Sequence, residues 1–329
     1  MKKITRVLAV FLILSSCPVV SEASWIWSPD LGRWINPKKS AKDTPDQQYD
    51  WAMQFYKEKN WDRAIEEFEK LPEVFPNSRL AAEGVYFAGL CQEEKQDLAR
   101  AADAYQKLID RYPYSDRIKD AVQREFEIAG RFAQGEKIKL VGIPAFSGRD
   151  KAVELYQHIV KNAPFGSYGD QAQYQIGEVH KSLADYEEAK KAYQTVVDEY
   201  PNSDLVPKAR YQIAYVSMLV SKKSQDSDAY TQKAIEEFKD FKEAYPGNAQ
   251  AVEADESIKA LRAKKAMTGF ETAAFYDRQK KWTSAKVYYQ EVVTGYPETP
   301  AASLAQKRLE ELSRQSEPES RKKGFLNLW

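Results

Sequence analysis

The chain has 329 residues, of which 43% are hydrophobic and 30% are charged, so it can bury a large core. Its 49 lysines and arginines balance 49 aspartates and glutamates, and this balance argues against nucleic acid as a partner. Two histidines and two cysteines cannot build a zinc site of the usual spacing, a disulfide framework or a Cys-x-x-Cys pair, so we expect no metal and no cofactor.

The amino terminus has the pattern of an export signal. Residues Met1–Arg6 are basic, and the apolar run Val7–Leu14 is far shorter than the roughly 20 residues of a membrane-spanning helix. The Leu-Ser-Ser sequence before Cys17 resembles a bacterial lipoprotein box, in which residues 1–16 are removed and the cysteine is acylated. Cleavage after Ala23 is the alternative and would release a soluble protein. Acyl chains on Cys17 would anchor the chain to a membrane that it does not span.

Residues 17–45 are predicted to form a tether between this signal and the folded region. Trp25, Trp27 and Trp34 lie there among prolines and a glycine, a composition that excludes a regular helix. An idle linker rarely exposes tryptophan, so we expect these residues to dock onto a partner or back onto the first repeat.

Between residues 46 and 314 one pattern occurs six times: a proline, an aromatic residue eight positions before it, and an alanine four positions before the aromatic. We call these the marker residues of units one to six: Ala64/Phe68/Pro76, Ala101/Tyr105/Pro113, Ala152/Tyr156/Pro164, Ala189/Tyr193/Pro201, Ala234/Phe238/Pro246 and Ala285/Tyr289/Pro297. In five units the residue before the marker proline is also aromatic, and Ala163 of unit three is the exception. A repeat of this period predicts stacked units that present an extended surface.

Each unit is predicted to form two helices. In unit four the first helix covers 170–183 and the second covers 187–199, after which the marker proline ends it. The marker alanine allows the two helices to approach closely, and the marker aromatic fills the gap between pairs. The pattern resembles tetratricopeptide repeats, which implies an all-α superhelix of about six helix pairs. Residues 300–314 are expected to form a C-terminal capping helix.

Three additions lengthen the basic unit. Residues 134–150 contain three glycines and a proline and are predicted to form a loop, either a binding element or a tolerated insertion. Residues 221–228 are predicted to form a short polar loop. Residues 249–264 contain good helix formers and no breaker, so they should extend the first helix of unit six.

An aromatic residue recurs on the predicted first helices, 27 positions before the marker proline, and a small residue follows it three positions later. The aromatics are Tyr49, Tyr86, Tyr174, Phe270 and, once the eight-residue loop of unit five is left out, Tyr211; unit three departs with Gln123 and Phe126. These rings either pack between helices or line a concave wall that binds an extended or helical peptide. Met53 and Tyr56 share the stripe of Tyr49 and make the amino-terminal groove the best peptide-binding candidate. The candidate peptide-binding residues are therefore Tyr49, Met53, Tyr56, Tyr86, Tyr174 and Tyr211.

No residue pattern indicates an enzyme. His158 and His180 show no cysteine or carboxylate partner at ligand spacing in the sequence, and Cys91 is expected to be a small buried apolar residue. Acidic residues are plentiful, but nothing in the sequence singles out a catalytic pair. We expect neither catalysis nor a small-molecule substrate.

The export signal with its Leu-Ser-Ser-Cys17 sequence, the Tyr-Pro-Asn-Ser sequence at 200–203 and the Tyr-Pro-Glu-Thr-Pro sequence at 296–300 together resemble outer-membrane assembly lipoproteins of the BamD type. The resemblance implies a lipid-anchored scaffold on the periplasmic face of the outer membrane that binds the β-barrel insertase and unfolded barrel proteins. It places substrate contact near Tyr49, Met53 and Tyr56, and insertase contact in units four to six. The tryptophan-rich segment and the 134–150 insertion depart from the family pattern.

Two alternatives remain open from the sequence. Another periplasmic repeat adaptor, such as a pilus-assembly or cell-division coordinator, would carry the same repeats. The tail at 315–329 is basic and then apolar, which suits either a frayed end or a peptide that docks onto a partner.

Overall fold

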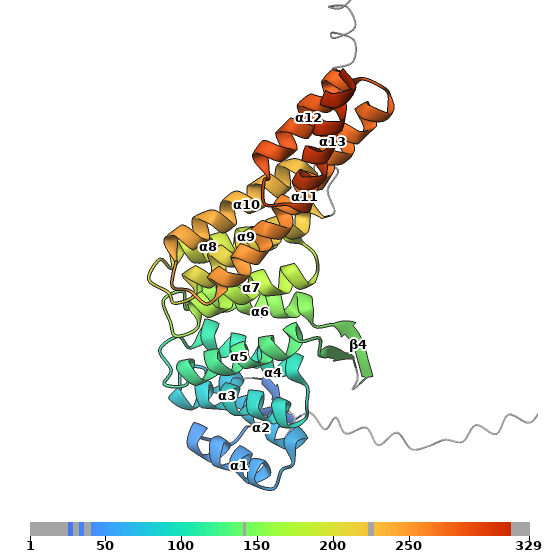
Figure 1. Cartoon of the computed structure of the whole chain (residues 1–329). Coiled ribbons are helices and arrows are strands. Elements are labelled where there is room, and N and C mark those ends of the chain that lie inside the picture. The colour runs from blue at the N-terminus through green and yellow to red at the C-terminus, as the bar shows by residue number, and fades with distance from the viewer. Residues whose placement is uncertain (1–25, 29–32, 36–40, 141–142, 223–226, 317–329) are drawn as a thin grey trace, which may run out of the picture. The chain divides into compact units, whose positions relative to one another are not determined.

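The structure is a computed structural model that describes residues 26–28, 33–35, 41–140, 143–222 and 227–316 (Figure 1). The expected signal, Cys17, Trp25 and nearly all of the 315–329 tail lie outside these residues. Within them the fold is α-helical apart from two short hairpins. The chain divides into two compact units, Met1–Gly84 and Val85–Trp329, and each is described by itself.

The amino-terminal compact unit contains a hairpin and the first helix pair. Strands β1 (Ile26–Ser28) and β2 (Arg33–Ile35) pair antiparallel, with Trp27 opposite Trp34 in the register. Helices α1 (Pro45–Lys57) and α2 (Trp61–Val74) follow, and α3 (Arg79–Glu94) begins before the boundary of the unit. The expected exclusion of a helix from the tryptophan-rich segment is confirmed at these six residues, whereas its docking stays a prediction.

The carboxy-terminal compact unit is a succession of helices in which neighbours along the chain pack against each other. The helices that follow α3 are α4 (Leu98–Arg111), α5 (Ile118–Ala133), α6 (Arg149–Asn162), α7 (Gly169–Ser182), α8 (Tyr186–Glu199), α9 (Val206–Ser221), α10 (Ser227–Ala244), α11 (Gln250–Arg278), α12 (Trp282–Gly295) and α13 (Pro300–Ser316). The prediction of six helix pairs and a terminal helix is confirmed. The boundaries predicted for unit four agree with α7 and α8 to within a residue at each end.

The marker residues form the core of every unit. All six marker alanines are 0% exposed, and all six marker aromatics are at most 2% exposed. Burying a ring of this size contributes about 2–3 kcal/mol relative to leaving it in water. The marker alanine has no side chain beyond Cβ, so it brings the paired helices close enough for the ring to contact both.

In units one, two, four and six, the turn inside the helix pair carries a non-glycine residue in the left-handed conformation. Lys59, Gln96, Ala184 and Lys280 have φ values of 58°, 57°, 63° and 59°, and each stands five positions before its marker alanine. The next residue is the N-cap of the second helix, and in two units its side chain accepts a hydrogen bond there: Asn60 accepts from the amide of Arg63 and Asp97 from that of Arg100. The left-handed residue allows the chain to reverse direction within a turn of three residues between the two helices.

The 134–150 insertion is not the loop that its glycines and proline predict. Strands β3 (Lys137–Leu140) and β4 (Ile143–Ser147) pair antiparallel, and the register shifts between Ile138 and Lys139 (Figure 1). Glycine and proline stand at its ends and at this irregular pairing, where a hairpin tolerates them. The extension of the first helix of unit six is confirmed, because α11 is continuous from Gln250 through residue 264. The predicted loop at 221–228 is shorter than expected at both ends: Ser221 ends α9, Ser227 begins α10, and residues 223–226 lie outside the described part of the chain.

No helix among the described residues is both long enough and apolar enough to cross a membrane.

Candidate protein-interaction surface

The recurring first-helix aromatics each contact the marker aromatic of their own unit. The ring centroids are 6.1 Å apart for Tyr49 and Phe68, 6.0 Å for Tyr86 and Tyr105, 5.4 Å for Tyr174 and Tyr193, 5.6 Å for Tyr211 and Phe238, and 5.4 Å for Phe270 and Tyr289. Unit three keeps the contact through Phe126, whose ring lies 5.4 Å from that of Tyr156. The alignment that brought Tyr211 into this set is therefore confirmed.

The small residue three positions after each of these aromatics makes room for the marker ring. A methyl group added at Gly89 would lie 2.7 Å from the Tyr105 ring, and one at Gly177 would lie 2.5 Å from the Tyr193 ring. Ala52, Ala214 and Ala273 fill the same position and are fully buried. The first helix thus presents an aromatic residue and a small residue to one ring.

Burial divides the candidate peptide-binding residues into two groups. Tyr86 and Tyr211 are buried, and burial together with the nearby Glu253 carboxylate raises the pKa of Tyr211 to about 12. Tyr49, Met53, Tyr56 and Tyr174 are half-buried and keep part of their surface exposed. Packing between helices accounts for the buried pair, and peptide binding by the half-buried group stays a prediction.

Polar contacts link consecutive repeats within the carboxy-terminal compact unit. In unit two the marker Tyr105 donates its hydroxyl to Glu93, and Arg124 of the next first helix contacts that carboxylate at 3.1 Å. In unit six the corresponding Tyr289 hydroxyl lies 3.4 Å from Asp277, and Arg308 reaches the carboxylate at 2.6 Å. The marker ring is therefore held by a carboxylate that is also paired with a cation from the following helix.

Helix α1 carries aromatic residues on more than the expected stripe. Tyr56 contacts the Trp61 ring at 5.5 Å, and on another side Trp51 contacts Phe55 at 5.0 Å. The Nζ of Lys42 lies 4.3 Å from the Trp51 ring, and all the aromatic residues of α1 are half-buried. Trp51 and Phe55 were not among the predicted binding residues, although their spacing of four residues places them on one helical face.

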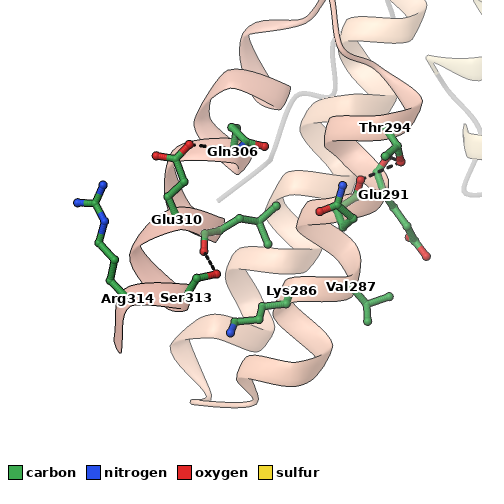
Figure 2. Close-up of a pocket in the computed structure, with 10 residues that line it drawn as sticks. Lys286, Val287, Glu291, Thr294, Gln306, Glu310, Ser313 and Arg314 are labelled. Carbon is green, nitrogen blue, oxygen red and sulfur yellow. Dashed lines mark hydrogen bonds between the residues drawn. The ribbon is translucent and has the colours of Figure 1, made fainter. Parts of the chain in front are cut away.

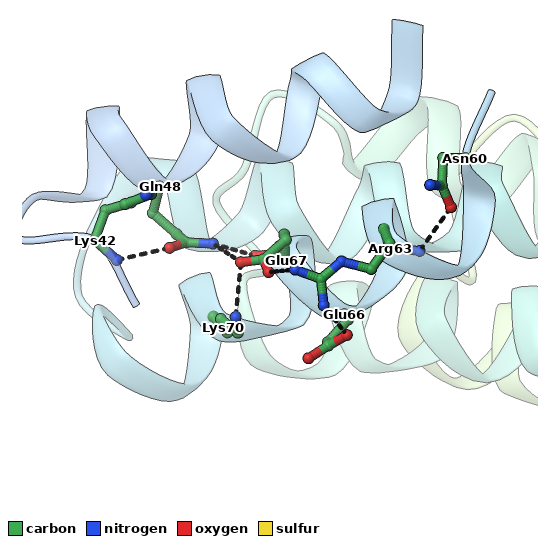
Figure 3. A network of polar contacts seen from close by, with 7 residues as sticks. All are labelled: Lys42, Gln48, Asn60, Arg63, Glu66, Glu67 and Lys70. Atoms are coloured by element: carbon green, nitrogen blue, oxygen red, sulfur yellow. Dashed lines mark hydrogen bonds and ion pairs between the residues drawn. The ribbon is translucent and has the colours of Figure 1, made fainter. Parts of the chain in front are cut away.

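A buried polar network fastens α1 to α2 (Figure 3). Gln48, fully buried, donates from Nε2 to the backbone oxygen of Glu67 at 2.7 Å and to its carboxylate at 3.0 Å. The Glu67 carboxylate also accepts from Lys70 at 2.7 Å and Arg63 at 3.0 Å, and the Gln48 oxygen accepts from the Lys42 amide at 2.8 Å. The segment that precedes α1 is thereby tied to α2 through Gln48. The two cations compensate the desolvated carboxylate.

A groove of about 870 Å³ lies between α12 and α13. Figure 2 shows the lining side chains, with Lys286, Val287, Glu291 and Thr294 on α12 and Gln306, Glu310, Ser313 and Arg314 on α13. Val287 is 53% exposed there. This groove combines an exposed apolar side chain with charges of both signs.

The internal repeat explains this groove. Counted from their marker prolines, Lys286 and Ser313 correspond to Lys190 of α8 and Ser217 of α9. Lys190 Nζ contacts Ser217 at 2.8 Å and Glu237 of α10 at 2.6 Å, so α10 covers the equivalent place earlier in the stack. The groove at α12 and α13 is therefore the position where the second helix of a further pair would pack.

The histidines lie in structural contacts. His158 has carboxylate partners after all: its Nδ1 lies 2.9 Å from Glu125 and its Nε2 lies 3.2 Å from Asp110. The sequence could not show them because they come from α5 and α4. His180 Nδ1 lies 3.7 Å from Asp185. Cys91 is buried as expected, and burial raises its pKa to about 12. Among the described residues no group of three acidic, histidine or cysteine side chains is placed to hold a metal.

Comparison with known proteins agrees with the repeat pattern. Residues 49–116 match the sequence profile of a tetratricopeptide repeat, and residues 149–324 match that of the family described as outer membrane lipoprotein (YfiO). A search of curated proteins gives no significant match.

Solved structures with similarity to the chain include three proteins of low identity. MamA from Desulfovibrio magneticus RS-1 is 16% identical, with a TM-score of 0.32, over 64% of this chain and 99% of that one. TTC0263, a tetratricopeptide-repeat protein of Thermus thermophilus, is 15% identical, with a TM-score of 0.32, over 65% of this chain and 99% of that one. A tetratricopeptide-repeat protein from Parabacteroides merdae ATCC 43184 is 13% identical, with a TM-score of 0.33, over 82% of this chain and 98% of that one.

The helix pairs, their marker residues and the first-helix aromatics define an all-α tetratricopeptide-repeat protein, a class whose repeat surface serves protein interaction. The family profile covers more than half of the sequence. The chain belongs to the outer membrane lipoprotein (YfiO) family.

Proposed function

We propose that this protein is a non-enzymatic scaffold of the outer-membrane β-barrel assembly machinery. In this role it binds the barrel insertase and unfolded barrel proteins at separate places on its repeat surface. Membership of the outer membrane lipoprotein family is the observation that supports the proposal most strongly. The repeat fold supplies an extended surface of the kind that holds protein partners.

Helix α1 is the proposed contact for unfolded substrate. Its half-buried residues Tyr49, Met53 and Tyr56 combine ring area, a hydroxyl and a flexible thioether, which suit apolar segments of varied sequence. The network around Gln48 and Glu67 holds α1 rigidly on α2, so the aromatic residues are pre-positioned. Tyr174 is a further candidate on α7.

Units four to six are the proposed contact for the insertase. The groove between α12 and α13 occupies the place of a following helix and carries the exposed Val287 beside Glu291 and Glu310. A helix or loop of a partner can use the packing that α10 makes on α8 and α9. The family profile spans these helices.

Acylation of Cys17 is the proposed means of attachment to the periplasmic face of the outer membrane. It supports the scaffold role because it would keep the repeats beside a membrane-embedded insertase. Labelling with a radioactive fatty acid should modify the wild-type chain and not Cys17→Ala. Equal labelling of both would favour cleavage after Ala23 and a soluble periplasmic protein.

Site-specific crosslinking tests the substrate contact. A photoreactive residue at Met53 should form adducts with unfolded barrel proteins in intact cells, and one at Val252, which is 67% exposed on α11, should not. Equal adducts at both positions, or none at Met53, would refute the assignment of α1. Adducts only with pilus or division proteins would instead favour the alternative adaptor role.

A further inference from the structure

The corner between α6 and α7 departs from the other corners of the array. Five units place an aromatic residue before the marker proline, whereas unit three has Ala163 there and carries Phe165 immediately after Pro164. Phe165 is 89% exposed. Exposed apolar rings mark an interaction surface when they form one patch with other apolar groups.

Packing within the fold does not require the Phe165 ring. Tyr168, later in the same corner, contacts Phe126 with ring centroids 4.9 Å apart, and Phe126 in turn contacts the marker Tyr156 at 5.4 Å. Tyr168 is half-buried by this contact. The corner is thus stabilised by one of its two aromatic residues, which leaves Phe165 directed to solvent.

The preceding corner shows the same feature. Tyr114 follows the marker proline of unit two and is 99% exposed. The contact of 3.2 Å between His158 of α6 and Asp110 of α4 places the ends of these helices, and hence the two corners, side by side. The other units have polar residues or glycine at this position: Asn77, Asn202, Gly247 and Glu298.

A groove of about 500 Å³ lies between this corner and the next one along the chain. Pro164 and Phe165 line one side of it, and Tyr200 and Pro201 line the other. Backbone contact keeps the corner tight, because a methyl group at Gly169 would overlap the Pro164 carbonyl oxygen. The walls therefore present one exposed ring, two prolines and part of a tyrosine.

The groove is also acidic. Asp170 and Glu199 line it, and none of its lining residues is lysine or arginine. Asp170 accepts a hydrogen bond from the Ser203 hydroxyl at 2.5 Å, which joins the two corners, and Glu199 is exposed. Burial and these two carboxylates raise the pKa of Tyr200, as expected in a negative local field.

We propose that this corner groove binds an extended segment of a partner protein in which a lysine or arginine stands next to an apolar residue. The cation would lie between the carboxylates and against the face of Phe165, and the apolar side chain would lie on the prolines. The volume accommodates a few side chains and not a folded domain. This surface is separate from α1 and from the α12–α13 groove, and it does not depend on the proposed function.

Peptide binding to the full-length protein tests the proposal. The probe is a fluorescein-labelled peptide, Gly-Lys-Phe-Arg-Leu-Lys-Gly, and its match replaces each cation by glutamate. Fluorescence anisotropy should show binding of the cationic peptide only. Phe165→Ala should weaken it at least tenfold and Glu199→Gln about threefold, whereas the remote Trp282→Ala and Glu256→Gln should leave it unchanged. Raised salt should weaken it as well.

Three results would overturn the proposal. They are equal binding of the two peptides, an affinity that Phe165→Ala leaves unchanged, and an equal loss in the Trp282→Ala control. Vesicles of phosphatidylethanolamine and phosphatidylglycerol provide a further arm. If Phe165→Ala abolishes cosedimentation with them but not peptide binding, the exposed rings face a lipid surface and the peptide assignment is wrong. Phe165 and Glu199 are exposed, so circular dichroism should show the same fold in both variants.

Discussion

The hydroxyl of Tyr193 donates a hydrogen bond to the Glu178 carboxylate at 2.7 Å, and Lys181 contacts that carboxylate at 2.8 Å. Lys181 also donates to the side-chain oxygen of Gln212 on α9 at 3.0 Å. Counted from the marker prolines, Lys181 stands where Glu93 and Asp277 stand in units two and six, and Gln212 stands in place of Arg124 and Arg308. Unit four therefore keeps a polar link between consecutive first helices. Its cation, Lys181, stands on the unit's own first helix, whereas in units two and six the cation stands on the following helix.

Removing the Tyr193 hydroxyl tests this link. Tyr193→Phe keeps the buried ring but removes the hydroxyl that donates to Glu178, whose contact with Lys181 remains, so we expect the free energy of unfolding to fall by about 1–2 kcal/mol. Tyr156→Phe is the matched control. Burial alone raises the pKa of the Tyr156 phenol to about 12, without the contribution from a neighbouring carboxylate that Tyr193 has. Urea denaturation of both variants measures the difference. Equal losses would show that the hydroxyl contact contributes nothing specific.

The glycines beneath the marker rings provide a second prediction. Gly177→Ala places a methyl group 2.5 Å from the Tyr193 ring and should destabilise the protein by about 1–3 kcal/mol. Gly130→Ala on α5 is the control, since its nearest neighbour would be 3.7 Å away. The control should stabilise the protein by up to about 1 kcal/mol through helix propensity. Thermal unfolding that shows the same sign for both variants would contradict the packing described for Gly177.

The left-handed turn residues provide a third prediction. Ala184 has a φ of 63°, a conformation that glycine adopts without steric cost. Ala184→Gly should therefore raise the free energy of unfolding by about 0.5–1 kcal/mol, whereas Ser182→Gly, at the end of α7, should lower it by a similar amount. Chemical denaturation of the two variants measures both changes. A loss of stability in Ala184→Gly would contradict the prediction that the left-handed conformation costs Ala184 free energy.

The pH dependence of stability should depend on His158. Burial disfavours the charged imidazolium, but its contacts with Glu125 and Asp110 outweigh this and raise the pKa of His158. Since the folded pKa exceeds the unfolded value of about 6.5, the stabilisation is complete below that value and is lost as pH rises through the folded pKa. Wild type should lose more stability than His158→Gln between about pH 6 and pH 9. Parallel stability curves for the two proteins would contradict this role.

Much of the fold follows from short-range patterns in the sequence. The alanine, aromatic and proline markers locate every helix pair because each has a specific structural role. The alanine allows the paired helices to approach closely, the aromatic ring fills the core between them, and the proline ends the second helix. The apolar residues of 300–314, such as Ala302, Ala305 and Leu309, locate α13, and the lack of a breaker in 249–264 locates the extension of α11. The hairpin at 137–147 was predicted as a loop. Two short strands that contain a proline and lie beside glycines have the same composition as a loop.

The candidate surface is less visible in the sequence. Spacing places Tyr86 and Tyr174 at equivalent positions, yet one ring is buried and the other half-buried, because exposure depends on the neighbouring unit. In unit two that neighbour supplies Arg117, whose guanidinium lies 4.9 Å from the Tyr86 ring. The partners of His158 come from other helices, and no local pattern contains them. Contacts between repeat units therefore could not be predicted from the sequence.

Copurification tests the central claim, that the chain is a scaffold of the barrel-assembly machinery, most directly. The full-length protein is extracted from membranes in mild detergent with an affinity tag, and the recovered β-barrel insertase is quantified against an untagged control. We predict near-stoichiometric recovery of the insertase. Recovery should fall when Val287→Glu places a charge in the α12–α13 groove. Extraction of an intact, folded scaffold without any insertase would contradict it.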